Sequence, residues 1–197
     1  MRTIKLLLGC IIITALSCGM ASADLIDVPL VWNPVNNSYN VSPATIAGYG
    51  SHKFKIMPFS DLRKDKKEIG RNIERGQLKL VTTKDDAGRW CADTLKEIFK
   101  HYGLKLADTK ETVVLKGDVV KLHVTESSTY EATATVKMTA RNSSGNVLWQ
   151  GTISGTSKRF GRSYKLDNYY ENLSEAYQDA VNGMLKNTAF RKALKAR

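Results

Sequence analysis

The chain has 197 residues, of which 42% are hydrophobic and 25% are charged, and its formal net charge at pH 7 is +11. This is ordinary soluble globular composition, which excludes a chain built mainly of membrane-spanning segments, and the length suits one well-formed core or two very small ones. A basic chain is attracted to acidic polymers and lipid headgroups, so we expect anionic surfaces among its neighbours.

The N-terminus has three zones. Basic Arg2 and Lys5 precede an apolar run from Leu6 to Leu16, and small residues follow as far as Ala23. This order predicts an export signal at residues 1–23. The apolar run is shorter than the roughly 20 residues that cross a bilayer, and no later segment approaches that length, so we expect no transmembrane helix in the mature protein.

Two processing sites compete within this signal. Ordinary signal peptidase would cleave after Ala23, whereas Ala15-Leu16-Ser17-Cys18-Gly19 resembles a lipobox, in which the cysteine is lipidated. The lipobox is imperfect because leucine is expected where Ala15 stands. We favour cleavage after Ala23 and a periplasmic protein. Lipidation of Cys18 is the alternative, and it would anchor the protein to the outer membrane; we expect membrane contact only in that case.

Cleavage after Ala23 also removes Cys10 and Cys18, which leaves Cys91 as the one cysteine, and it lowers the net charge by two, to +9. No intrachain disulfide is then possible. A lone thiol in an oxidising compartment is safest when it is buried, so we expect Cys91 to be structural. The alternative is an intermolecular disulfide or a redox role.

The part of the chain after the signal contains an extended segment, a short strand and a charged loop. Residues 24–51 contain three prolines and no sustained period, which predicts an extended leader, although Val28–Trp32 could lie against the sheet as an edge segment. Lys53–Met57 alternates charge with bulk, which predicts a half-buried strand. A densely charged loop at residues 61–70 then leads to a short apolar run at residues 78–81.

The central part predicts a helix followed by three strands. Thr83, with the acids just after it, should cap an amphipathic helix over about residues 84–102. Strand-like runs follow at residues 112–125, 130–141 and 147–158, and residues 142–146 form a hairpin loop. The middle strand should bury its Ala132, Ala134, Val136 and Met138 face.

Apolar residues recur at helical spacing from Leu173 to Leu185, which predicts a second amphipathic helix to about Lys186, and a short basic tail follows with Phe190 and Leu194 as anchors. The fold class is therefore α+β, with a mainly antiparallel sheet of about five strands and both helices packed on one face. We expect one domain over residues 52–197.

Candidate catalytic groups are few. His52, His101 and His123 show no metal-binding spacing, and no phosphate loop or dinucleotide-binding glycine motif occurs. Ser154 lies between glycines in a strand pattern rather than at a strand-to-helix turn. The sequence therefore predicts no catalytic, metal-binding or cofactor-binding residues and no cofactor.

One basic cluster stands out as a candidate anion-binding loop, and it contains Lys158, Arg159, Arg162 and Lys165. Two aromatic residues are interleaved with these cations, and no acid occurs before Asp167. The simpler interpretation is a solvated loop between the last strand and the last helix.

Several phrases resemble the YajG-like bacterial lipoproteins, a family of small envelope proteins of largely uncharacterised function. They are Met57–Arg63, Glu68–Gly70, Val81–Thr83, Trp90 in a helix closed by Gly103-Leu104, Leu115–Val119, Gly145–Trp149 and Asn168–Ser174. The similarity covers about Lys53 to Leu194. It implies an α+β envelope domain that is commonly tethered by an N-terminal lipid, and it supplies no catalytic residues.

We therefore predict a non-enzymatic periplasmic or outer-membrane-associated protein that acts by binding an envelope protein or an anionic envelope component. The alternative is a binder of anionic polymer or lipid headgroups through the Lys158–Lys165 loop. A hydrolase built on the exposed acids Asp61 and Asp65 is a third hypothesis, without support in the sequence. Nucleic acid is not an expected partner, because export separates the protein from it.

Overall fold

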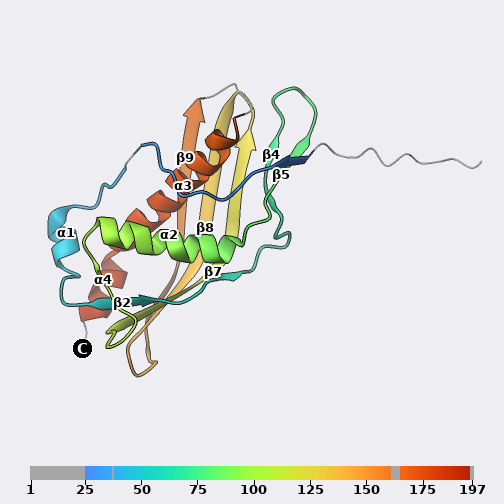
Figure 1. Cartoon of the computed structure of the whole chain (residues 1–197). Coiled ribbons are helices and arrows are strands. Elements are labelled where there is room, and N and C mark those ends of the chain that lie inside the picture. Colours follow the sequence, from blue (N-terminus) through green and yellow to red (C-terminus); the bar gives the residue numbers. More distant parts are fainter. Residues whose placement is uncertain (1–24, 37, 161–164, 196–197) are drawn as a thin grey trace, which may run out of the picture.

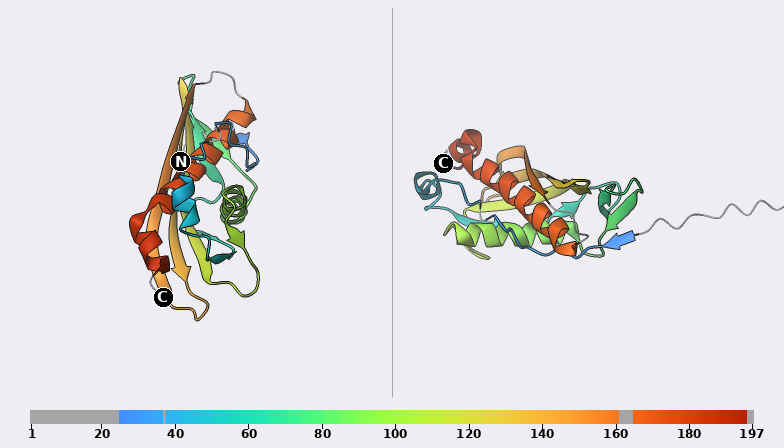
Figure 2. Two further views of the ribbon diagram at one scale, coloured as in Figure 1. Left: turned by 90° about the vertical axis from the view of Figure 1, so that its left-hand side faces the viewer. Right: turned by 90° about the horizontal axis from the view of Figure 1, so that it is seen from above.

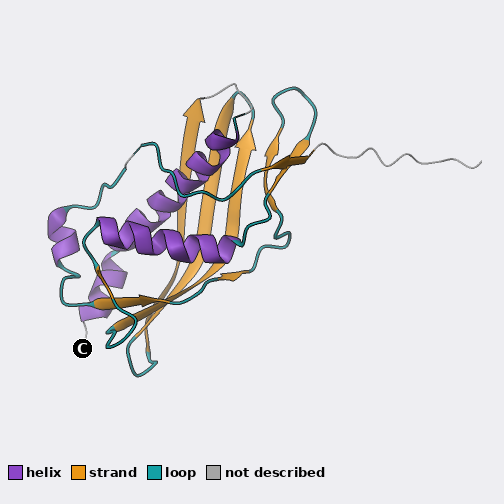
Figure 3. Cartoon of the chain, viewed as in Figure 1, coloured by secondary structure: helices purple, strands orange, loops and turns teal. Residues whose placement is uncertain are grey.

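The computed structural model describes residues 25–36, 38–160 and 165–195, which form one mixed sheet of nine strands with four helices (Figures 1 and 3). The elements in chain order are β1 (Leu25–Asp27), α1 (Pro43–Ala47), β2 (Lys53–Ile56), β3 (Ser60–Asp61), β4 (Glu68–Asn72), β5 (Lys79–Thr82), α2 (Ala87–His101), β6 (Lys105–Leu106), β7 (Val113–Glu126), β8 (Thr129–Arg141), β9 (Val147–Phe160), α3 (Leu166–Lys186) and α4 (Thr188–Lys195). The α+β class is confirmed, but the expected five strands and two helices understate both counts.

The three long strands form the expected antiparallel meander. β7 pairs with β8 from Val114 opposite Arg141 to Glu126 opposite Tyr130, and β8 pairs with β9 along its length. The inward face of β8 is buried as predicted, at Ala132, Ala134, Val136 and Met138. Alternation over a dozen residues made this part of the sheet predictable.

Several short strands lie on the other edge of β7. The sequence predicted a strand at β2, and β5 lies at the apolar run of residues 78–81, but β1, β3 and β4 were not predicted. β2, β3 and β4 pair with β7 one after another, all parallel to it, and β5 and β1 continue the sheet beyond β4. A strand of two or three residues, such as β3 or β1, is too short to show a period of two, and its place is fixed by its partner. The sheet is therefore mixed rather than mainly antiparallel.

Both long helices lie on the same face of the sheet, as Figure 2 shows in edge view. α2 is capped by Asp86, whose side chain accepts a hydrogen bond from the Arg89 backbone N–H at 3.0 Å, so the expected Thr83 cap is wrong. Thr83 accepts a hydrogen bond from the Asp85 N–H instead and shapes the turn before the helix. The basic tail is helical, as α4, and Phe190 is fully buried.

The segment predicted to be an extended leader packs on the domain. We call residues 28–36 and 38–41 the strap, because they cross α3 on the side away from the sheet and bury Val28 and Val41. The Asn33 N–H donates to Ser174 Oγ at 3.1 Å, and the Asn182 side chain donates to the Ser38 carbonyl at 2.7 Å. Polar residues of α3 are thus buried under the strap and hydrogen-bonded to it.

A buried carboxylate ties four elements together at one end of the sheet. Glu126, at the end of β7, accepts hydrogen bonds from the hydroxyls of Tyr130 in β8 and Tyr169 in α3, and from the Asn72 amide in β4. Burial and the neighbouring Glu126 raise the pKa of both tyrosines, so they stay protonated and donate. We call these four residues the Glu126 cluster.

Candidate functional site: a cationic notch in the sheet

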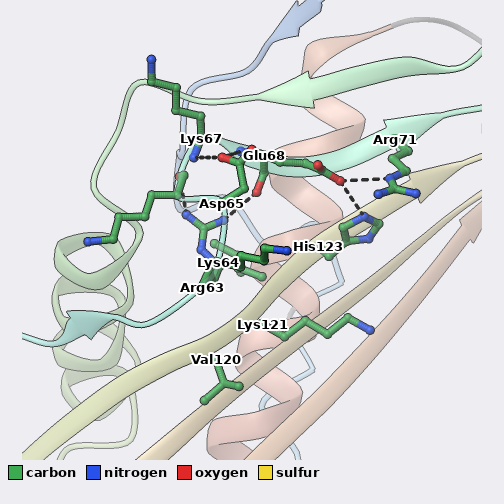
Figure 4. Close-up of a pocket in the computed structure, with 11 residues that line it drawn as sticks. Arg63, Lys64, Asp65, Lys67, Glu68, Arg71, Val120, Lys121 and His123 are labelled. Carbon is green, nitrogen blue, oxygen red and sulfur yellow. Dashed lines mark hydrogen bonds and ion pairs between the residues drawn. The ribbon is translucent and has the colours of Figure 1, made fainter.

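A gap in strand pairing creates the principal candidate site. β3 pairs with β7 only as far as Asp61 opposite Val119, and β4 resumes the pairing at Gly70 opposite Val124. Among the described strands, none pairs with β7 residues 120–123 on this edge. The loop at residues 62–67 leaves the sheet here and returns to it, and a cavity of about 830 Å³ lies between the loop and β7 (Figure 4). We call this cavity the notch.

A β-bulge in β7 shapes the floor of the notch. The register between β7 and β8 shifts between Val119 and Lys121, so Val120 is the extra residue. Val119 is buried, whereas Val120 is 39% exposed and Lys121 is exposed as well. Bulges commonly redirect side chains in this way, and here the bulge brings Lys121 to the open side of the notch.

Arg63 fixes the conformation of the loop at residues 62–67, which forms one wall of the notch. Its guanidinium is largely buried and donates to Asp61 at 2.8 and 3.0 Å, to the Glu68 carbonyl at 2.9 Å and to the Lys66 carbonyl at 2.6 Å. Burial opposes the ionisation of Asp61, but the hydrogen bonds and charge of Arg63 outweigh it and lower the pKa of that carboxyl. One side chain therefore joins both ends of the loop.

Asp65 reinforces the same loop from within. Its carboxylate accepts hydrogen bonds from the backbone N–H groups of Lys67 at 2.8 Å and Glu68 at 3.1 Å. These bonds stabilise the ionised form and lower the pKa of Asp65. Asp61 and Asp65, the two acids of the hydrolase hypothesis, are thus both engaged in holding the loop.

The charge of the notch is strongly positive. Six cationic side chains and two carboxylates line it, which gives a net formal charge of +4 with neutral His123. Glu68 pairs with Arg71 at 3.0 Å and approaches His123 at 3.8 Å, while burial lowers the pKa of His123 and keeps it neutral near pH 7. Four lysines at the notch form no ion pair with a described residue: Lys64, Lys66, Lys67 and Lys121.

The arrangement of these lysines fits an anionic group. In Figure 4 the side chains of Lys64 and Lys121 extend toward the same open side of the notch, while Lys67 turns away. Lys64 comes from a loop locked by Arg63, and Lys121 comes from a bulge in a long central strand. The backbone at both lysines is thus held in place, and it brings two ammonium groups to one cavity, which can hold a phosphate or carboxylate group.

A second cavity of about 1060 Å³ shares Lys66 and Lys67 with the notch but has the opposite charge balance. Four aspartates line it, against three lysines. They are Asp27, Asp61, Asp85 and Asp86. Its size exceeds that of the notch, but its carboxylates repel an anion, so the notch is the better anion site.

The basic cluster predicted from sequence lies at the end of β9 and the start of α3. Lys158 pairs with Glu131 at 2.7 Å, and Arg159 pairs with Glu171 at 2.5 Å. Lys165 is exposed just before α3, and Arg162 lies outside the described residues, as does Cys18. Two of these cations are thus already paired with carboxylates of the chain.

The three histidines lie apart from one another. His52 is buried, His101 stacks on the Tyr39 ring at 3.4 Å, and His123 lies at the notch. Within the described part of the chain, no group of three or more histidine, cysteine or acidic side chains is placed to hold a metal ion. No described helix combines the length and the apolar character that a membrane span requires.

Sequence reasoning noted the charged loop at residues 61–70 but missed the notch. The lysines of that loop lie far along the chain from Lys121, and only the parallel pairing of β3 and β4 with β7 brings them together. The alternation of Leu122 and Val124 with His123 showed which face His123 occupies. It held no sign of the bulge at Val120.

Comparison with protein-family models and with curated proteins gives no match. Among solved structures, a Xanthomonas campestris protein of family DUF330 shares 14% identity with a TM-score of 0.54, over 88% of this chain and 99% of that one. A proposed lipoprotein from Caulobacter crescentus CB15 has 11% identity and a TM-score of 0.44, over 79% of this chain and 100% of that one. PelC from Paraburkholderia phytofirmans, solved as a dodecamer, has 15% identity and a TM-score of 0.43, over 75% of this chain and 91% of that one. The chain therefore shares its fold with the Xanthomonas campestris protein.

Proposed function

We propose that the chain is an exported, non-enzymatic protein of the bacterial cell envelope, and that it acts by binding a phosphate- or carboxylate-bearing envelope component at the notch. The observation that carries this proposal is the pair Lys64 and Lys121, which form no ion pair with a described residue and extend toward one open side of the notch. The Arg63 hydrogen bonds and the β7 bulge hold the backbone at these two lysines, which an ordinary solvated lysine run lacks.

The envelope assignment has support from the sequence. Residues 1–23 have the basic, apolar and small-residue zones of an export signal, and the phrases from Met57 onward resemble the YajG-like lipoproteins. We include membership of that family in the proposal. Cleavage after Ala23 gives a periplasmic protein, and lipidation of Cys18 gives one tethered to the outer membrane.

The Lys158–Lys165 loop is the second candidate for the same ligand class. Lys165 is exposed just before α3, and Lys158 is exposed near the end of β9. The pairing of Lys158 with Glu131 and of Arg159 with Glu171 reduces the charge available to an external anion. We therefore rank this loop behind the notch.

A paired set of charge reversals tests the proposal. Purified lipopolysaccharide is titrated into the chain beginning at Asp24, and the double variant Lys64→Glu, Lys121→Glu is compared with the matched variant Lys158→Glu, Lys165→Glu. We expect the notch variant to bind about tenfold or more weakly, since each lost contact is worth about 1 kcal/mol, and wild-type binding to weaken as salt rises.

The matched variant changes the net charge by the same amount, so it should lose only the general attraction that both reversals remove. Equal losses in the two variants would mean that overall charge, and not the notch, controls binding. A larger loss in the matched variant would transfer the site to the Lys158–Lys165 loop. Wild-type binding that does not respond to salt would contradict an electrostatic site altogether.

A further inference from the structure

Four large apolar side chains are exposed at one end of the domain, and we call them the apolar tip. They are Ile73 at 46% exposure, Leu78 at 54%, Phe160 at 79% and Leu166 at 42%. We propose that the apolar tip inserts into the headgroup region of a phospholipid bilayer and holds the domain upright on the membrane surface. This contact is separate from the notch and does not require lipidation of Cys18.

The strand directions explain why these four residues lie at the same end of the domain, although β7 and β8 separate the β4–β5 hairpin from β9. β4 is parallel to β7, and β9 runs in the same direction because both β7 and β9 are antiparallel to β8. The β4–β5 hairpin, the end of β9 and the start of α3 therefore all lie at one end of the sheet, along the upper side of Figure 1. Ile73 and Leu78 belong to the hairpin, Phe160 ends β9, and Leu166 begins α3.

The Glu126 cluster holds this end rigid. Asn72, which donates to Glu126, directly precedes Ile73, and Tyr169 lies one helical turn after Leu166. Phe160 pairs with Thr129, next to the third cluster residue, Tyr130. Hydrogen bonds of the cluster therefore hold the backbone near Ile73, Phe160 and Leu166. Large apolar side chains exposed together at one end of a domain commonly mark an interaction site.

The distribution of the tip residues fits a bilayer better than a protein partner. Apolar side chains on separate loops and strand ends leave gaps between them, and fluid lipid fills such gaps whereas a rigid protein surface must match them. Lys165 is exposed directly before Leu166, and Lys158, two residues before Phe160, is exposed although it pairs with Glu131. Long cationic side chains next to exposed apolar ones suit the boundary between anionic headgroups and acyl chains.

The path of the chain gives an independent argument for the same orientation. β1 begins with Leu25, which pairs with Leu80 just after the β4–β5 hairpin. The preceding residues therefore join the domain at the end that carries the apolar tip. A lipid on Cys18 would lie seven residues from Leu25, or at most about 25 Å of extended chain, so an anchored protein would also present this end to the membrane.

Vesicle co-sedimentation tests the proposal with the unlipidated chain beginning at Asp24. Two vesicle types are used, phosphatidylcholine alone and phosphatidylethanolamine with phosphatidylglycerol. We expect wild type to bind both, more tightly the second, and the variant Phe160→Ser, Leu166→Ser to lose about tenfold or more on both. The control Met57→Ser, Val147→Ser removes exposed apolar groups from the opposite end and should bind as wild type does.

The outcomes separate this proposal from the notch. Thermal melts check that both variants are folded. We expect this because the replaced side chains are solvent-exposed. Failure of wild type to bind either vesicle, or undiminished binding by the tip variant, would overturn the proposal. Binding that appears only with phosphatidylglycerol and is abolished by Lys64→Glu, Lys121→Glu would assign membrane contact to the notch instead.

Discussion

Cys91 is a free cysteine in the core of the domain. The thiol is fully buried in α2, as predicted, and burial raises its pKa, so little thiolate forms at neutral pH. We predict that Cys91→Ala lowers the free energy of unfolding by about 1 to 2 kcal/mol through the small cavity it leaves, with ligand binding unchanged. Native protein should react slowly with a thiol reagent and the urea-unfolded chain rapidly. Fast labelling of the native state, or a dimer that disappears on reduction, would show a reactive thiol instead.

At the scale of elements, the contact between α3 and β9 depends on Gly155. A Cβ atom there would clash with the backbone of α3 at Ala176 and Ala180, which cannot move aside as a side chain can. We predict that Gly155→Ala costs about 1 to 3 kcal/mol of stability, measured by urea unfolding. Gly183→Ala is the matched control, because open space surrounds Gly183 in the same helix and alanine favours helix. Equal stability of the two variants would contradict a tight contact between helix and sheet.

Long and short elements differ in how well the sequence predicts them. β8 and α2 are long enough for a period of two or of 3.6 residues to be recognised in the sequence. Their bounds were therefore predicted within a few residues, and their buried faces were identified. β3 has two residues, and its place depends on β7 far along the chain. The notch could not be predicted for the same reason, because it lies between the end of β3 and the start of β4. Its charged loop was visible in the sequence, but its partner Lys121 was not.

At the scale of the whole molecule, the strap packs the N-terminal segment of the chain against α3. We predict that a chain beginning at Ser42 loses roughly 3 to 6 kcal/mol of stability relative to one beginning at Asp24, an upper estimate from the two buried valines it lacks. A chain beginning at Val28 keeps the strap and loses only β1, so it should retain most of that stability in thermal melts. If all three chains melt alike, the segment is a passive leader.

The strap also imposes an order on folding. Its hydrogen bonds join Asn33 to Ser174 and Ser38 to Asn182, pairs that are separated by 141 and 144 residues. The strap binds a surface that α3 supplies, and α3 itself packs on the completed meander, so we expect the N-terminal segment to dock last although it is synthesised first. During that interval the polar face of α3 is exposed to solvent, which its serine, glutamate and asparagine side chains tolerate. Because part of the contact under the strap is polar, the unfinished chain exposes less apolar surface than it would if that contact were wholly apolar.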